Sequence, residues 1–347
     1  MIYVMDGFNI IDSIETKRSV IWNVQYNGLN EFELIVAGTD ENIEKLAVGR
    51  YLVRDIDVID NNEYRNVMII TTNRLTFDPD TGWILTVTGN GLKALLKRRV
   101  IWTQTNLDGT VENGIRTLIT ENAINPSDTA RMIPNMVLDS ASGLTDEFKA
   151  QCFGENLAEW IQQTCETYNY GWDIYISESK YHVKIYKGTD RSGTVIFSRN
   201  YDNLISGDYE YNKDEYKNAA IVGGEGEGKE QRRVTIGTAT GLDRYETYVD
   251  GSGVSSDGEI ITLETYLNML KEYGKNEIAQ TAITQTFTGE VVANGMYKLN
   301  EDYFLGDVVH IENERGIEAN SRISEIIYSE DENGVVVSPT FNDWEVE

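Results

Sequence analysis

The stretch that spans residues 299–328 constrains the fold more than any other part of the chain. Its centre holds a Gly306-Asp307 pair, where the backbone must turn or bulge before a run of β-branched residues begins. A polar segment at residues 313–316 then reverses the chain, and residues 321–328 alternate apolar and polar side chains. A period of two residues is typical of a strand with one buried face. The stretch therefore predicts a hairpin unit of a small β-barrel, although any antiparallel β domain would satisfy the same pattern.

Residues 1–90 repeat this strand pattern several times. Asp6-Gly7 separates two short apolar runs, which is a strong hairpin signal, and the segment 78–82 joins two further strands. The pattern predicts about seven strands, enough to curl into a barrel. We expect this first barrel domain to be completed by strands from about residues 206–250.

The pattern changes at residue 91, where helical periodicity replaces the alternation of strands. The segments expected to be helical are 91–97, 110–121 and 155–168, and those expected to be strands are 147–153, 171–177 and 180–187. Residues 122–144 are rich in Ser, Asn, Asp and Gly and are expected to form an irregular connection. Residues 91–205 therefore predict an α+β domain inserted into the β structure.

Towards the C-terminus, residues 251–283 predict a connecting loop followed by a helix, for which Thr262 is a suitable N-cap. Residues 284–347 return to the alternation of strands and predict a second β-barrel domain. The expected fold class is thus α+β and mainly β, with two small β-barrel domains and an inserted α+β domain.

Charge is the strongest feature of the composition. The chain has 30 basic and 57 acidic residues, which gives a net charge of −27 at pH 7. No basic block is present that could hold nucleic-acid phosphates, so recognition of a nucleic-acid sequence is not expected. An acidic surface usually keeps a protein soluble through self-repulsion. Alternatively, part of the charge lines a passage through which a polyanion slides without adsorbing.

Features of membrane and secreted proteins are missing from the sequence. No apolar span reaches the length of a transmembrane helix, so no membrane insertion is expected. The N-terminus lacks the basic start of a signal peptide, which favours a cytoplasmic origin. The two cysteines, Cys152 and Cys165, are too few for a disulfide framework and lie in apolar segments, which predicts reduced thiols in a core.

Motifs for catalysis or metal binding do not stand out. His182 and His310 each lie in an alternating segment, which favours a structural role in a strand. Neither the histidines nor the cysteines have the spacing of zinc ligands. The segments 78–82 and 331–334 superficially resemble calcium loops, but both are turn signals first. The glycine-rich segment 224–228 lacks the lysine of a phosphate-binding loop. We therefore expect no enzyme activity, no metal and no cofactor.

Several residues are candidates for contacts with other proteins. Most of the 20 tyrosines and 6 tryptophans are expected to fill the core. Trp102, which follows a basic triplet, and Trp344, in the acidic tail, are candidates for interface anchors. Two glycine-containing segments complete the set: the acidic loop residues Gly224, Glu225, Gly226 and Glu227, and the turn residues Gly306 and Asp307.

Three motifs occur in an order that points to a known family. They are the helix signal of residues 91–99, the strand and glycine-rich loop of residues 218–228, and the turn and strand of residues 303–309. In this order the chain resembles, over essentially its whole length, the siphovirus-type tail-tip hub proteins. These are related to the central baseplate hubs of contractile phages and of phage-tail-like bacteriocins. Each motif is short, and the resemblance rests on their order.

The resemblance implies a structural protein of the virion, assembled in the host cytoplasm. Members of the family look like homotrimers whose two barrel domains per subunit form a pseudo-sixfold ring, which joins the hexameric tail tube to a threefold tip or spike. The implied partners are the tail tube protein, the distal tail protein, the tape measure protein and a spike or tip fibre, and DNA would pass through the ring. Some hubs carry a wall-cleaving domain after the second barrel, and this chain, which ends at residue 347, is expected to lack one.

Two other functions are compatible with parts of the sequence. A receptor-binding or carbohydrate-binding tail-tip protein would group exposed aromatic residues on one loop face. An enzyme acting on cell-wall polymer would need two carboxylates facing each other in a cleft. The inserted α+β domain and the order of the motifs favour the hub over both.

Overall fold

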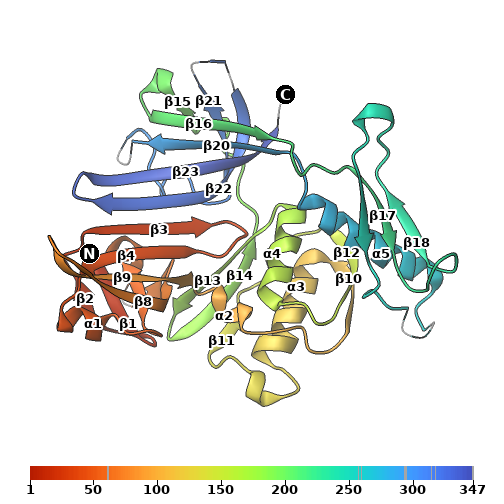
Figure 1. Cartoon of the computed structure of the whole chain (residues 1–347), viewed down its shortest axis with the longest axis horizontal. Coiled ribbons are helices and arrows are strands. Elements are labelled where there is room, and N and C mark those ends of the chain that lie inside the picture. Colours follow the sequence, from red (N-terminus) through yellow and green to blue (C-terminus); the bar gives the residue numbers. More distant parts are fainter. Residues whose placement is uncertain are drawn as a thin grey trace.

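The computed structural model describes residues 1–60, 62–256, 258, 260–292, 295–313, 315–316 and 318–345, with side chains up to residue 342. Its strands form one long sheet and three smaller ones, and a few helices pack against them (Figure 1). The predicted fold class, α+β and mainly β, is confirmed. Four separate hydrophobic clusters divide the interior, one for each group of elements described below.

The first β unit takes up residues 1–91, as the alternating pattern predicted. Its elements are β1 (Ile2–Asp6), β2 (Asn9–Ile14), β3 (Ser19–Gln25), β4 (Glu31–Ala37), α1 (Asp40–Lys45), β5 (Tyr51–Arg54), β8 (Met68–Asp78) and β9 (Gly82–Gly91). The hairpin predicted at Asp6-Gly7 is confirmed, because Asp6 pairs with Asn9 and Gly7 has a φ of +57°. The turn after Asp78 is also confirmed, and the Asp78 carboxylate accepts hydrogen bonds from the backbone of the turn itself.

The C-terminal β unit contains the hairpin predicted from residues 299–328. Its strands are β15 (Ile196–Ser198), β16 (Leu204–Asn212), β20 (Thr284–Val291), β21 (Val308–Glu312), β22 (Glu318–Asp331) and β23 (Gly334–Glu345). β21 and β22 pair antiparallel around the predicted polar reversal. β22 also pairs with β3 of the first unit, where Tyr328 lies opposite Trp22, so one sheet runs through both β units.

The inserted unit lies between the two β units in sequence and packs beside them (Figure 1). Its elements are α2 (Ala94–Lys97), β10 (Thr105–Thr110), α3 (Val111–Ile119), β11 (Met136–Leu138), β12 (Glu147–Cys152), α4 (Leu157–Tyr168), β13 (Gly171–Ser177) and β14 (Lys180–Tyr186), and the short β6 (Val58–Asp60) and β7 (Glu63–Tyr64) join its sheet. α4 begins after Asn156, whose side chain accepts from Ala158 N, and ends at Asn169 in the left-handed conformation. Cys152 and Cys165 are buried free thiols in its core, as predicted.

Residues 122–144 are more ordered than the sequence predicted. They include β11, which pairs in parallel with β14, so that Val137 lies opposite His182. A run of three residues is too short to show a period, and its partner is more than forty residues away along the chain. Short helical turns complete the chain: η1 (Asp55–Asp57), η2 (Thr120–Ile124), η3 (Thr129–Arg131), η4 (Arg199–Tyr201) and η5 (Gly241–Asp243).

A small lobe follows β16 and projects from the rest of the molecule (Figure 1). It consists of β17 (Ala219–Gly223), β18 (Arg233–Ile236), β19 (Glu246–Asp250) and α5 (Leu263–Ala279), which Thr262 caps as predicted. The strand pairing differs from the prediction that residues 206–250 complete the first barrel. β16 pairs with β20, and β17, β18 and β19 form their own sheet, because Val222 and Val249 are buried with Leu270 of α5. Alternation shows which face of a strand is apolar but not what covers it.

Candidate functional site

The long sheet presents one face that no core covers. Between β16 and β8 it contains eight strands in the order β16-β20-β23-β22-β3-β4-β9-β8, stacked side by side in Figure 1. One face packs on the cores of the two β units, where Trp22, Leu34 and Phe341 are buried. Because successive strand residues point to opposite faces, every residue paired with an outward residue is also outward.

The strand register fixes which residues share the outward face. Asp208 pairs with Thr288, Thr288 with Thr340, Thr340 with Glu325, and Glu325 with Gln25, so this row crosses from β16 to β3. A second row continues from Asn23 through Glu31 to Asn90. Outward residues with hydroxyl, amide or carboxylate groups include Thr72, Thr76, Thr86, Thr88, Asn90, Glu31, Glu33, Asn23, Gln25, Glu325, Ser329, Ser338, Thr340, Thr286, Thr288, Glu290, Asp208 and Glu210. The apolar residues Ile21, Ile35, Ile84 and Ile327 lie among them. We call this surface the polar sheet face.

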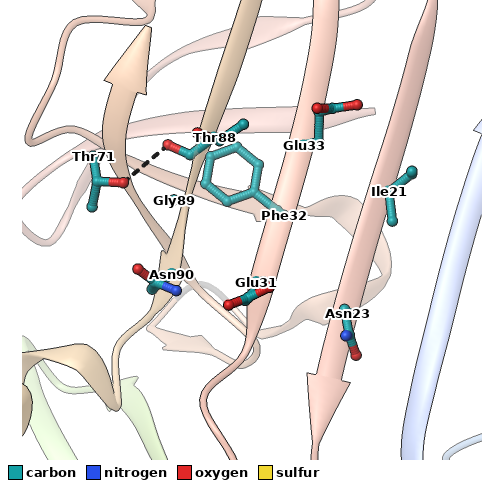
Figure 2. Close-up of a pocket in the computed structure, with 9 residues that line it drawn as sticks. All are labelled: Ile21, Asn23, Glu31, Phe32, Glu33, Thr71, Thr88, Gly89 and Asn90. Carbon is teal, nitrogen blue, oxygen red and sulfur yellow. Dashed lines mark hydrogen bonds between the residues drawn. The ribbon is translucent and has the colours of Figure 1, made fainter.

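A shallow hollow lies on the polar sheet face over β3, β4 and β9 (Figure 2). Figure 2 shows Asn23, Glu31 and Asn90 on three neighbouring strands at one end of it. Gly89 of β9 and the bulge of β8 between Ile70 and Thr72 lie beside the hollow. A Cβ at Gly89 would overlap the carbonyl oxygen of Ile69, so only glycine fits this close approach of β8 and β9.

One carboxylate ties the two β units together on this face. Glu325 of β22 accepts hydrogen bonds from the Asn23 side chain at 2.6 Å and the Gln25 side chain at 3.3 Å, both on β3. Its second oxygen accepts from the Thr340 hydroxyl of β23 at 3.1 Å. Hydrogen bonds to a charged acceptor are stronger than those between neutral groups. Glu325 therefore holds β3, β22 and β23 in register where the units join.

Both ends of the eight-strand stretch are open edges. β8 pairs with β5 only near Met68 and Ile69, and beyond Ile70 no described strand pairs with its outer edge. At the other end, β16 pairs with β20 alone among the described strands. Natural proteins normally cover, shorten or charge such edges, because an open edge is a template for pairing with another chain.

The open part of β8 also carries exposed apolar side chains. Leu75 and Phe77 are 45% and 58% exposed although they lie opposite Leu85 and Trp83 on the side of the sheet that faces the core. Phe77 and Trp83 stack edge to face at 5.2 Å at the tip of the β8–β9 hairpin, and Trp83 is 51% exposed. This aromatic tip was not among the predicted residues. The sequence nevertheless indicated it, because Phe77 and Trp83 are aromatic residues on either side of the predicted turn at 78–82, and such a turn places its two flanking residues next to each other.

Two of the predicted candidates, Gly306 and Asp307, lie at a junction inside the chain. Asp307 is 3% exposed and accepts hydrogen bonds from Thr189 N at 2.8 Å, Phe304 N at 3.0 Å and Arg191 Nε at 2.6 Å. Gly306 has a φ of +93°, and a Cβ there would overlap the ring of Tyr26. These residues connect the C-terminal unit with the end of the inserted unit and with the first unit. Their position is internal rather than exposed.

The acidic glycine-rich loop is half fixed and half exposed. Gly224 is buried against the Tyr266 hydroxyl of α5. Glu225 accepts from Ser256 N at 2.6 Å and forms an ion pair with Arg232 at 3.1 Å. Burial opposes the charge of Glu225, but these hydrogen bonds and Arg232 outweigh it and lower the pKa of the carboxyl. Gly226 and Glu227 are exposed at the tip of the loop.

The structure describes the side chain of only one of the two tryptophans that were predicted to be interface anchors. Trp102 is 63% exposed, with the guanidinium of Arg131 5.0 Å from its ring centre. Trp344 lies in β23, but its side chain is outside the described residues. The structure does not bring the predicted residues together in one place; it separates them into a junction, a loop and an exposed ring.

Metal sites and membrane-spanning helices are absent from the described residues. In the ranges given above, no three or more His, Cys, Asp or Glu residues are grouped so that they could hold a metal ion. No helix of the described residues has the length and apolarity needed to cross a bilayer. His182 and His310 lie in β14 and β21, as predicted, and bond to Asp139 and Asn320.

The architecture is shared with solved phage tail proteins. A tail protein from Neisseria meningitidis matches with a TM-score of 0.60 at 14% identity, covering 99% of this chain and 96% of that one. A 43 kDa tail protein of prophage MuSo2 from Shewanella oneidensis matches with a TM-score of 0.60 at 12% identity over 98% and 97% of the two chains. Prophage tail protein gp18 from Listeria monocytogenes matches with a TM-score of 0.54 at 13% identity over 100% and 95%. The fold is therefore that of phage tail proteins.

A comparison with sequence profiles of protein families shows which family of phage tail proteins the chain belongs to. The profile of the siphovirus ReqiPepy6 Gp37-like proteins matches residues 1–342, and the chain belongs to this family. No curated protein matches the sequence. The chain is thus a phage tail protein and a component of the virion, as the resemblance predicted.

Proposed function

We propose that the chain is a structural hub of the tail tip, in which three copies close into a ring through the open edges of β8 and β16. The observation that carries the proposal is the continuous eight-strand stretch with an open edge at each end. Two different edges that meet between copies form a heterologous interface, which generates a ring when the rotation closes. Pairing between copies would also satisfy the edge groups that β8 and β16 leave open.

The size of such a ring supports passage of DNA. Three copies of eight strands make a barrel of 24 strands. At about 4.8 Å between neighbours, strands parallel to the ring axis give a circumference of roughly 115 Å and a diameter of roughly 37 Å. Side chains project about 5 Å from the wall on each side, which is half the spacing of packed sheets. They leave a bore of roughly 27 Å in diameter, and tilt of the strands makes the bore wider. Double-stranded DNA passes through an opening of this size.

The polar sheet face has the chemistry of the inner wall of this ring. Hydroxyl and amide side chains dominate it, and its charged members include Glu31, Glu33, Glu325, Asp208 and Glu210. Arg74 of β8 is a cation on the same face. Affinity for DNA comes mainly from cations that neutralise phosphates, so an acidic wall lets DNA slide without adsorbing. The role is structural and needs no catalysis.

The remaining partners follow from the place of a hub in a tail. The ring would contact the hexameric tail tube on one side and a threefold spike or tip fibre on the other, with the distal tail and tape measure proteins nearby. Assembly in the host cytoplasm precedes incorporation into the virion.

The experiment is native mass spectrometry and negative-stain imaging of the chain over a range of concentrations, with two matched lysine variants. Phe77→Lys places a charge on the open edge of β8, whereas Thr88→Lys places it on the polar sheet face. The wild type and Thr88→Lys are expected to form three-copy rings, and Phe77→Lys is expected to remain monomeric. Rings that form equally well with Phe77→Lys would refute the edge contact.

A further inference from the structure

An exposed surface on the inserted unit is separate from both open edges. It is formed where the segment after α2 meets the segment after β12 and the end of η3. Its apolar members are Val100, Trp102, Met132 and Phe153, which are 40%, 63%, 45% and 61% exposed. Arg98, Arg99 and Arg131 surround them, and we call these seven residues the Trp102 surface.

Backbone contacts hold the three segments together. Gly154 N donates to the Ile101 carbonyl at 2.9 Å, and Val100 forms a bridge with Asn156. The Arg131 guanidinium donates to the Val100 carbonyl at 2.6 Å, and Arg99 Nε donates to the Arg131 carbonyl at 2.6 Å. The exposed side chains are therefore presented on a fixed frame, which lowers the entropy lost when they bind.

Within the described residues, none of the three arginines of this surface forms an ion pair, although the Glu155 carboxylate lies nearby and accepts from Phe153 N at 2.7 Å. Arg99 and Arg131 bond to carbonyl and amide oxygens, and neither has an ion pair with a described carboxylate. Burial and the neighbouring guanidinium groups of Arg131 and Arg98 lower the pKa of Arg99. In a chain with a net charge of −27, this is a local cationic site.

We propose that the Trp102 surface docks a second tail protein through a contact segment that is acidic around an apolar anchor. The composition favours a protein partner, because Trp, Phe, Met and Arg are the residues enriched at the centre of protein interfaces. The positive charge favours an acidic partner, since opposite potentials steer association and exclude wrong partners. The proposal rests on membership of the tail family and not on the ring, because the surface lies on the inserted unit, away from β8 and β16.

The test measures binding of the purified chain to the purified tube, distal tail and tape measure proteins of the same particle by calorimetry. One of them is expected to bind, with an affinity that falls as salt rises. Trp102→Ala and Phe153→Ala are each expected to weaken this binding by about 30-fold or more, as truncation of an interface anchor does. Arg98→Glu, at an exposed site, is expected to weaken it about tenfold.

Trp83→Ala is the matched control, because it removes an exposed tryptophan at the β8–β9 tip. It is expected to leave this binding unchanged while it weakens self-association, so failure of the ring and failure of the docking site are distinguishable. Circular dichroism checks that each variant folds, and Phe153→Ala and Arg98→Glu carry the test if Trp102→Ala does not. The proposal is overturned if none of the three proteins binds or if binding ignores all three substitutions. The same three variants are also tested for self-association and for binding to purified host cell-wall glycan. The proposal is overturned if the substitutions weaken one of these two properties and leave binding to the tail proteins unchanged.

Discussion

The junction around Asp307 offers the sharpest test of how the three units are held together. Replacement by alanine leaves two backbone N–H groups, of Thr189 and Phe304, without their acceptor and removes the partner of Arg191. An unsatisfied buried donor costs about 1–3 kcal/mol. Breaking a buried ion pair costs about 3–5 kcal/mol, but the Arg191 side chain is 33% exposed and can be rehydrated. We therefore expect Asp307→Ala to lower the free energy of unfolding by about 3–5 kcal/mol.

Urea denaturation followed by tryptophan fluorescence measures this change. Asp307→Asn keeps an acceptor for only one of the two backbone donors, because Thr189 N and Phe304 N bond to different carboxylate oxygens, and it also loses the ion pair, so its cost should be close to that of Asp307→Ala. Asp190→Ala is the control, because Asp190 lies between Thr189 and Arg191, the partners of Asp307, but is exposed and accepts hydrogen bonds from Ser192. Its cost should stay below about 1 kcal/mol. If Asp307→Ala costs no more than Asp190→Ala, the view of Asp307 as the anchor of the junction is wrong.

Three further predictions concern the sheet and a buried lysine. Gly89→Ala should destabilise the chain by about 2–3 kcal/mol in thermal unfolding, since its Cβ overlaps the Ile69 carbonyl, whereas Gly253→Ala, with open space around it, should be neutral. Glu325→Ala should cost about 1–3 kcal/mol in calorimetry, because three hydrogen bonds at the seam are lost, and a neutral result would show that strand pairing alone joins the units. Burial lowers the pKa of Lys93 to about 8, although its ammonium donates to the Gln25 and Gly28 carbonyls. The unfolded chain therefore binds more protons between pH 8 and 10.5, and urea titrations should show stability rising with pH across this window by up to about 3 kcal/mol, a rise that Lys93→Met abolishes.

Local features of the fold were predictable from sequence. The hairpin at Asp6-Gly7 needs a residue with positive φ between two apolar runs, and both requirements are visible in neighbouring residues. The same holds for α5, where Thr262 caps a segment with helical spacing of apolar residues. Such signals work because the residues that form the structure are close in the chain.

Long-range pairing was not predictable. Tyr328 and Trp22 lie opposite each other across some three hundred residues, and nothing in either strand identifies the other. The alternation in β16 was recognised, but its partner β20 was not, because alternation is the same for any partner. Gly306 and Asp307 were picked out as unusual, yet their internal position depends on Tyr26 and Arg191, which approach only in the folded chain.

Electron cryomicroscopy of assembled tail tips tests the central claim most directly. The account predicts three copies of the chain in a closed ring, with residues 71–78 of one copy beside residues 204–212 of the next. Glu31, Glu33 and Glu325 should then face a bore filled by DNA or tape measure protein. A tip in which the copies touch through other elements, or in which the polar sheet face points to the outside of the particle, would contradict it.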